Sequence, residues 1–129
     1  MMSTMRSGLM RFGLMLCALL LVVPASSWAH AYLVKSSPAR RAVLSNAPSR
    51  VVLWFNERLE AQFSQLSVWN QDGGQVDNGD MQVGPDDAKK LSVGLPTLPA
   101  GAYSVKFRVL SVDGHVVEAE FPFRVRGRQ

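Results

Sequence analysis

YSVKFRVLSVDGHVVEAEFPFRV, residues 103–125, is the stretch that decides the fold of this chain. Apolar and polar side chains alternate without a fault over residues 103–109, and they alternate again over residues 117–125. Alternation with a period of two is typical of a β-strand with one buried face. Asp113-Gly114, which lies between the two parts, is a favourable turn pair. We therefore predict a long β-hairpin whose tip carries Asp113 and His115.

The rest of the chain predicts further short strands and no convincing helical period. Pro122 argues that the last strand has an edge position or a bulge near it, because proline cannot donate to a sheet ladder. Residues 58–65 leave room for one helical turn. Turn residues separate the remaining apolar runs, which are residues 32–35, 51–55, 66–69 and 91–93. This pattern predicts an all-β domain, a small Greek-key β-sandwich or barrel.

The first 29 residues have the features of an export signal. Arg6 and Arg11 give a positively charged start, residues 12–23 are almost wholly apolar, and small residues lead to Ala29. The alternative is an uncleaved membrane anchor, but the apolar stretch is short for a bilayer span. We expect residues 1–29 to be a cleaved signal peptide and residues 30–129 to be a single domain.

The composition of this mature chain limits its chemistry. Cys17 is the only cysteine and lies in the leader, so thiolates are excluded as ligands and nucleophiles. Met81 is the only methionine left, which excludes a methionine-rich Cu(I) site. The leader takes two of the 14 basic residues and none of the 10 acidic ones, and the remaining charge is too mild to indicate nucleic acid. We expect a soluble monomer without stable membrane insertion.

Only two histidines are present, and both stand at chemically suggestive positions. Cleavage after Ala29 would make His30 the first residue, so that its free α-amine and its ring Nδ1 could close a chelate ring on one metal ion. His115 follows Asp113 by two residues at the predicted hairpin tip. Several nitrogens with one carboxylate suit Cu(II), with Zn(II) and Ni(II) as weaker competitors. We predict a metal site from His30, Asp113 and His115, although a surface histidine and a plain Asp-Gly turn are the alternatives.

Six motifs carry a resemblance to a known family. They are HAYL (30–33), SSPA (36–39), VLWFNERL (52–59), LPAGAYSV (98–105), VLSVDGH (109–115) and FPFRV (121–125). Together they span residues 30–129, the expected copper-binding domain, which resembles the compact form of the CopC family of periplasmic copper-binding proteins. The resemblance implies an Ig-like or cupredoxin-like β-sandwich that holds one Cu(II) ion per mature chain.

The resemblance also implies a role for each site residue. By motif position, His30 supplies the amine and Nδ1, His115 supplies the second imidazole, and Asp113 is the further ligand. Glu57 matches an acidic position near the copper in the family. This match implies that its carboxylate hydrogen-bonds the N-terminal amine or a bound water, as outer groups at metal sites commonly do. The alternative is an ordinary acidic residue after a strand.

These implications lead to one expected function and leave two others open. The expected function is Cu(II) binding in the periplasm for copper homeostasis or resistance, with copper sequestered or passed to a CopD-type inner-membrane protein. A copper-dependent oxidase or monooxygenase with an N-terminal histidine brace is the second hypothesis, and a metal-free Ig-like structural module is the third. A carboxylate close to the metal and the small domain favour binding over catalysis, so we expect no enzyme.

Overall fold

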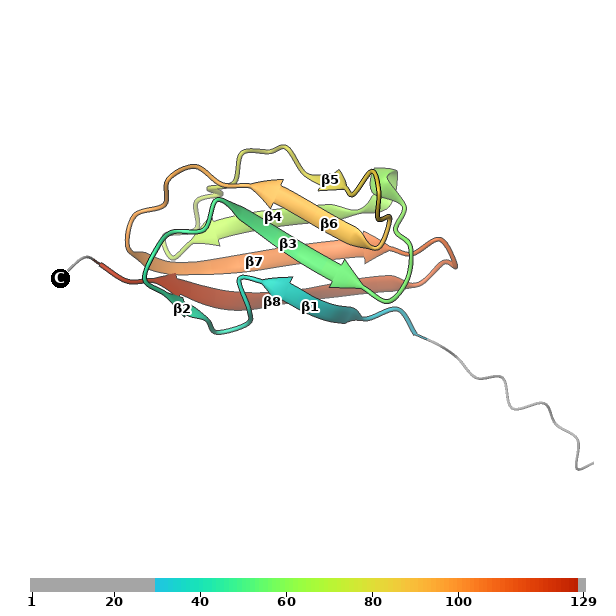
Figure 1. Cartoon of the computed structure of the whole chain (residues 1–129), viewed down its shortest axis with the longest axis horizontal. Helices are drawn as coiled ribbons and strands as arrows, with labels where there is room; N and C mark the ends of the chain where they lie inside the picture. The colour runs from blue at the N-terminus through green and yellow to red at the C-terminus, as the bar shows by residue number, and fades with distance from the viewer. Residues whose placement is uncertain (1–29, 128–129) are drawn as a thin grey trace, which may run out of the picture.

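The computed structural model describes residues 30–127, which form two β-sheets packed face to face (Figure 1). One sheet has the strand order β1-β3-β6-β5 and the other has the order β2-β8-β7-β4. The strands are β1 (Leu33–Ser37), β2 (Val43–Leu44), β3 (Arg50–Phe55), β4 (Gln65–Asn70), β5 (Gln82–Val83), β6 (Lys90–Gly94), β7 (Gly101–Leu110) and β8 (Val116–Val125). The predicted all-β sandwich is confirmed. The expected leader and its cleavage point lie outside the described residues.

The hairpin formed by β7 and β8 is the longest pairing described in the sandwich. Its antiparallel register runs from Gly101↔Val125 to Leu110↔Val116, as the alternating sequence predicts. The inward side chains of this hairpin meet those of β3 and β6 in the core, because a register with period two sends every second residue to the same face. The most deeply buried members of the core are Val51, Leu53, Val68, Leu91, Val93, Val105, Val109 and Phe123.

The chain passes repeatedly between the two sheets. Among residues 30–127, only the β5–β6 and β7–β8 connections join neighbouring strands of one sheet. Such crossing connections are typical of Greek-key sandwiches. The single helical turn expected within residues 58–65 is the 3₁₀ helix η2 (Ala61–Phe63). Strands β2 and β5 were not predicted, because a strand of two residues is too short to show a period.

Pro122 lies in β8 where the strand has almost no outer neighbour. The carbonyl of Pro122 accepts a hydrogen bond of 2.7 Å from the Arg41 N–H, so this side of the residue faces away from β7. Strand β2 pairs with β8 only at Arg124 and Val125. The missing N–H of Pro122 therefore costs no ladder hydrogen bond, although β8 lies between β2 and β7 and is not an edge strand as a whole.

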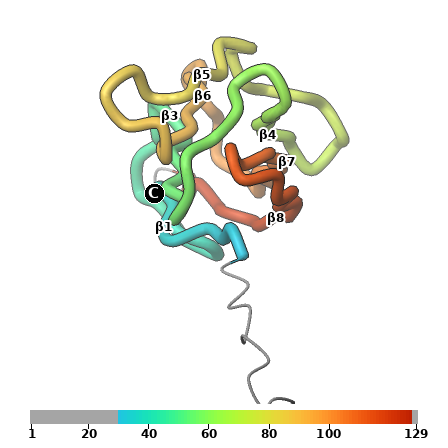
Figure 2. Tube along the Cα trace, turned by 90° about the vertical axis from the view of Figure 1, so that its right-hand side faces the viewer, coloured from blue at the N-terminus to red at the C-terminus, as the bar shows by residue number. Residues whose placement is uncertain are grey.

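One end of the sandwich gathers several chain segments that matter for the site. The start of β1, the end of β3 and the β7–β8 turn all lie at the right-hand end of Figure 1. Viewed from that end, the blue start of the described chain lies beside the orange-red hairpin (Figure 2). No helix within residues 30–127 has the length and apolar character needed to cross a membrane.

Candidate metal centre

Two segments far apart in the sequence bring the two histidines together. His30 precedes β1 in one sheet, and His115 lies in the turn between β7 and β8 of the other sheet. Their imidazole rings meet edge to face, with centroids 5.7 Å apart and planes at 67°. A metal–nitrogen bond to imidazole is about 2 Å long. At this spacing each ring can present one nitrogen to a single ion.

Ser111 organises the turn that carries His115. The side chain of Ser111 is buried, with 1% of the residue exposed. Its hydroxyl accepts a 3.1 Å hydrogen bond from the His115 N–H and donates to Asp113 Oδ1. The backbone closes the same turn, because the Ser111 N–H donates to the His115 carbonyl at 2.9 Å. These contacts hold Asp113 and His115 on one side of the turn.

Asp113 faces the His115 ring. Its Oδ2 lies 3.0 Å from Nδ1 of His115, and its Oδ1 is engaged by Ser111. Nδ1 is shielded from solvent and has no aligned hydrogen-bond partner in the described chain, so the contact is an ion-pair distance and not a straight hydrogen bond. This leaves Nε2 as the ring nitrogen available to a metal. Carboxylates behind metal-bound histidines commonly orient the ring in this way. Direct ligation by Asp113 requires its carboxylate to turn away from His115.

The electrostatics of Asp113 favour the charged form. The hydroxyl of Ser111 is the main cause that lowers the pKa of this carboxyl, and the nearby imidazole and backbone of His115 lower it further. Desolvation opposes these effects without overcoming them. The turn therefore presents a carboxylate beside the imidazole, and that negative charge favours a cation nearby.

Asn56 holds the segment that carries His30. It follows directly after β3, and its side-chain Oδ1 accepts a 2.6 Å hydrogen bond from the Tyr32 N–H. Its Nδ2 donates to the His30 carbonyl at 3.2 Å. Asn56 is not among the residues that the sequence analysis predicts for the site. The available signal was its place inside the motif 52–59, beside Glu57.

Glu57 lies next to Asn56 at the same end of the sandwich and is half-buried. Its side chain makes no hydrogen bond or ion pair with another residue in the range 30–127, so its predicted contact with the N-terminal amine stays a prediction. In the same range, no group of three or more His, Cys, Asp or Glu side chains is arranged to hold a metal ion. The donors brought together are thus the two imidazoles, with Asp113 behind His115.

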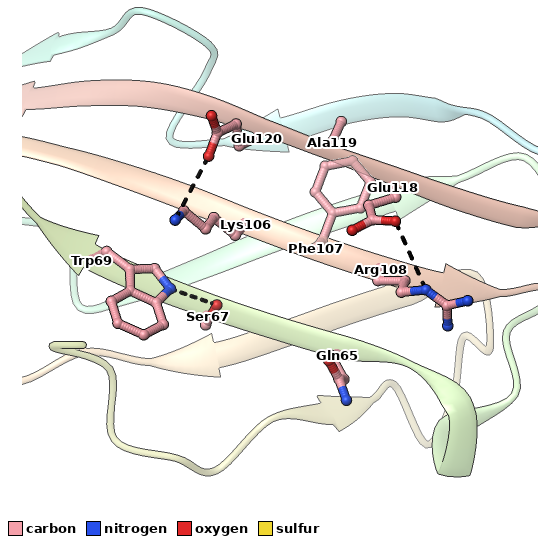
Figure 3. A pocket seen from close by; sticks show the side chains of 9 residues that line it. All are labelled: Gln65, Ser67, Trp69, Lys106, Phe107, Arg108, Glu118, Ala119 and Glu120. Carbon is pink, nitrogen blue, oxygen red and sulfur yellow. Dashed lines mark hydrogen bonds and ion pairs between the residues drawn. The ribbon is translucent and has the colours of Figure 1, made fainter. Parts of the chain in front are cut away.

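A shallow hollow elsewhere on the molecule offers no comparable donor set. It lies on the outer face of β4, β7 and β8 and contains neither histidine (Figure 3). Its charged side chains pair with each other, Lys106 with Glu120 and Arg108 with Glu118, both at 3.8 Å. The indole N–H of Trp69 donates to the Ser67 hydroxyl at 2.8 Å. The charged side chains of this face are thus paired with each other.

Known proteins are similar to this chain over most of its length. The family model described as CopC domain matches residues 33–126. Protein YobA of Escherichia coli (strain K12) is 35% identical over 125 residues, which are 96% of this chain and 98% of YobA. Copper transport protein CutJ of Bacillus subtilis (strain 168) is 35% identical over 116 residues, which are 89% of this chain but only 21% of CutJ.

The structural comparison agrees with the sequence comparisons. The crystal structure of CopC from Methylosinus trichosporium OB3b superposes with a TM-score of 0.68 and 34% identity, over 78% of this chain and 97% of that chain. The likeness covers a whole sandwich, and the names of these relatives connect it with copper. The chain therefore belongs to the CopC family, and its function is related to copper.

Proposed function

We propose that the protein binds one Cu(II) ion per mature chain between His30 and His115. The observation that carries this proposal is the 5.7 Å separation of the two rings, the only histidines in the chain. Copper would be cargo for this protein, held in the periplasm after export and either sequestered or passed on. Cleavage after Ala29 would complete the site, because only then does His30 have a free α-amine.

The donor set explains the choice of Cu(II). The amine and Nδ1 of His30 close one chelate ring, and Nε2 of His115 adds a third nitrogen. Asp113 supplies an oxygen if its carboxylate turns toward the metal, and orients the imidazole of His115 if it does not. Three nitrogens and one oxygen in a tetragonal arrangement suit Cu(II) among the divalent first-row metals. Glu57 is close in sequence to the clamp on His30, and we propose that it hydrogen-bonds the amine or a bound water.

Delivery to a partner is part of the proposal. A segment similar to this chain makes up about a fifth of CutJ, a protein named for copper transport. The presence of such a segment in a protein named for copper transport supports a role for this chain in passing copper on. We propose that this partner is a CopD-type inner-membrane protein. The relatives' names, copper transport and copper resistance, support a carrier over an enzyme.

A Cu(II) titration of the protein that begins at His30 tests the site. We expect His115→Ala to weaken binding by more than about tenfold, because changes even to groups outside the ligand set commonly cost that much at metal sites. Lys106→Ala, on the outer face of β7, is the control and should bind as the unchanged protein does. Tight binding by His115→Ala would refute the site. Affinity should also fall in acid, since protons compete for the amine and the imidazoles.

The enzyme alternative has its own test. The copper-loaded protein is incubated with a reductant, oxygen and a polysaccharide, and products are measured. We expect no copper-dependent turnover. Turnover that disappears in His115→Ala would replace the carrier proposal with the monooxygenase hypothesis.

A further inference from the structure

We propose that Asn56 is a positioning residue that selects how His30 chelates copper. This inference rests on the proposed function, because it concerns the same site. It adds that the amide of Asn56 both places the His30 backbone and occupies the His30 carbonyl. The amine and Nδ1 are thereby left as the pair of donors that His30 offers.

The geometry is a three-point clamp around Ala31. Oδ1 of Asn56 accepts from the Tyr32 N–H at 2.6 Å, and Nδ2 donates to the His30 carbonyl at 3.2 Å. The backbone N–H of Asn56 donates to the Tyr32 carbonyl at 3.2 Å. Ala31, between the two clamped residues, is buried with 8% exposed. One residue of the motif 52–59 thus fixes the chain on both sides of Ala31.

The sheet does not hold this segment without the clamp. The ladder between β1 and β3 begins at Leu33↔Phe55, and its register shifts between Leu33 and Lys35. Before Leu33, the backbone bond from the Asn56 N–H to the Tyr32 carbonyl continues this pairing by a single contact, and chain ends with few such ties are usually poorly ordered. Among the described residues, Asn56 is also the only one whose side chain hydrogen-bonds the segment 30–32.

The hydrogen bond from Asn56 to the His30 carbonyl affects which chelate His30 can form with copper. A free N-terminal residue offers a metal two competing chelates, one through the amine and its own carbonyl oxygen, the other through the amine and the ring Nδ1. The hydrogen bond from Asn56 Nδ2 engages the carbonyl oxygen, whereas none of the three clamp contacts uses the His30 nitrogen. The clamp therefore favours the ring chelate, and it orients the ring toward His115.

Asn70 provides a matched control at the other end of the sandwich. Its Oδ1 accepts hydrogen bonds from the backbone of Asp72 and Gly74, at 3.1 and 2.8 Å. Like Asn56, Asn70 holds a loop through its side-chain amide. In the sheet, however, Asn70 pairs with Tyr103, which lies at the end of β7 remote from the histidines. Loss of either amide should therefore lower the stability of the fold to a similar extent. Only the loss of the Asn56 amide should change Cu(II) binding.

The experiment compares Asn56→Ala, Asn56→Asp and Asn70→Ala in the protein that begins at His30. Cu(II) affinity and the Cu(II) electron paramagnetic resonance spectrum are measured for each. We expect Asn56→Ala to bind about tenfold more weakly and to show a second copper species. Asn56→Asp keeps the acceptor for Tyr32 but loses the donor to the carbonyl, so it should also show the second species. Asn70→Ala should keep the affinity and the single species.

The outcomes separate this inference from the proposed function. A single unchanged spectrum and unchanged affinity in both Asn56 variants would overturn the inference, even where His115→Ala abolishes binding. Tight binding by His115→Ala would instead refute the copper site itself. If Asn56→Ala fails to fold, Asn56→Asp carries the test, and its spectrum decides between the two chelates.

Discussion

Tyr103 shows how one side chain closes the end of the sandwich opposite the histidines. Its hydroxyl donates to the Pro99 carbonyl at 2.5 Å, four residues earlier, and its ring stacks on Phe123 with centroids 5.3 Å apart. A tyrosine bonded back to the chain just upstream is a recurrent feature of Ig-like sandwiches. Burial raises the pKa of Tyr103, because the phenolate would lose its solvation.

This raised pKa predicts a loss of stability in alkali. The stabilisation is complete below the ordinary phenol pKa of about 10 and is lost as the pH rises through the higher folded value. We expect Tyr103→Phe to lower the free energy of unfolding by about 1 kcal/mol near neutral pH. Above pH 10 the unchanged protein should lose stability faster than the variant does. Urea unfolding across this pH range measures both, and parallel curves would contradict the prediction.

At the scale of elements, the β7–β8 hairpin combines a regular pairing with an irregular turn. Gly114 has φ of +90°, a conformation that L side chains rarely adopt, and an added Cβ would meet no atom within 4 Å. The requirement for glycine is therefore conformational and not steric. The Gly114 N–H donates to the Ser111 carbonyl at 2.9 Å, so a change of this backbone would also disturb Asp113 and His115.

Gly114→Ala tests the link between this turn and copper. We expect a loss of about 1–2 kcal/mol in the free energy of unfolding, because alanine at this φ is strained. Gly73→Ala is the control, since Gly73 has φ of +84° and equally open surroundings in the loop after β4. Both variants should lose similar stability in thermal or urea unfolding. Only Gly114→Ala should lose Cu(II) affinity, and equal affinity in the two would argue against the coupling.

At the scale of the whole molecule, the proposed site joins the two sheets. His30 leads into β1 of one sheet, and His115 lies in the hairpin of the other sheet. A metal held between them binds only when the sandwich is folded. Binding to the folded state alone stabilises it by mass action, by about 2.7 kcal/mol when free copper exceeds Kd a hundredfold.

Copper should therefore raise the melting temperature of the protein that begins at His30 by about 10–20 °C, since 1 kcal/mol corresponds to about 4–8 °C in a domain of this size. A form with one methionine before His30 should gain much less, because the α-amine then lies on a different residue. Thermal unfolding of both forms at the same free Cu(II) measures the difference. Equal gains would show that the amine of His30 is not a ligand.

The long hairpin was predictable from the sequence, whereas the shortest strands were not. Alternation in residues 103–125 determined the hairpin and its buried face, because a period of two is a local property of a strand. The two-residue strands β2 and β5 had no such signal. The chemistry of the site was also visible, since His30, Asp113 and His115 are donors by residue type. The Asp113-Gly114 pair placed the tip of the hairpin, but it did not give the register, because the ladder closes at Leu110↔Val116 and leaves residues 111–115 in the turn.

The arrangement of those donors belongs to the tertiary structure. Sequence alone could place the two histidines at strand ends, but the 5.7 Å approach of their rings requires β1 and the β7–β8 hairpin to occupy different sheets with a common end. Asn56 and Ser111 carry no ligand pattern, and their importance comes from hydrogen bonds to residues 24 and four positions away. The sequence by itself thus determined the all-β fold and the kinds of donor. Only the packing of two sheets decided which donors meet, because that contact depends on long-range pairing and not on local periodicity.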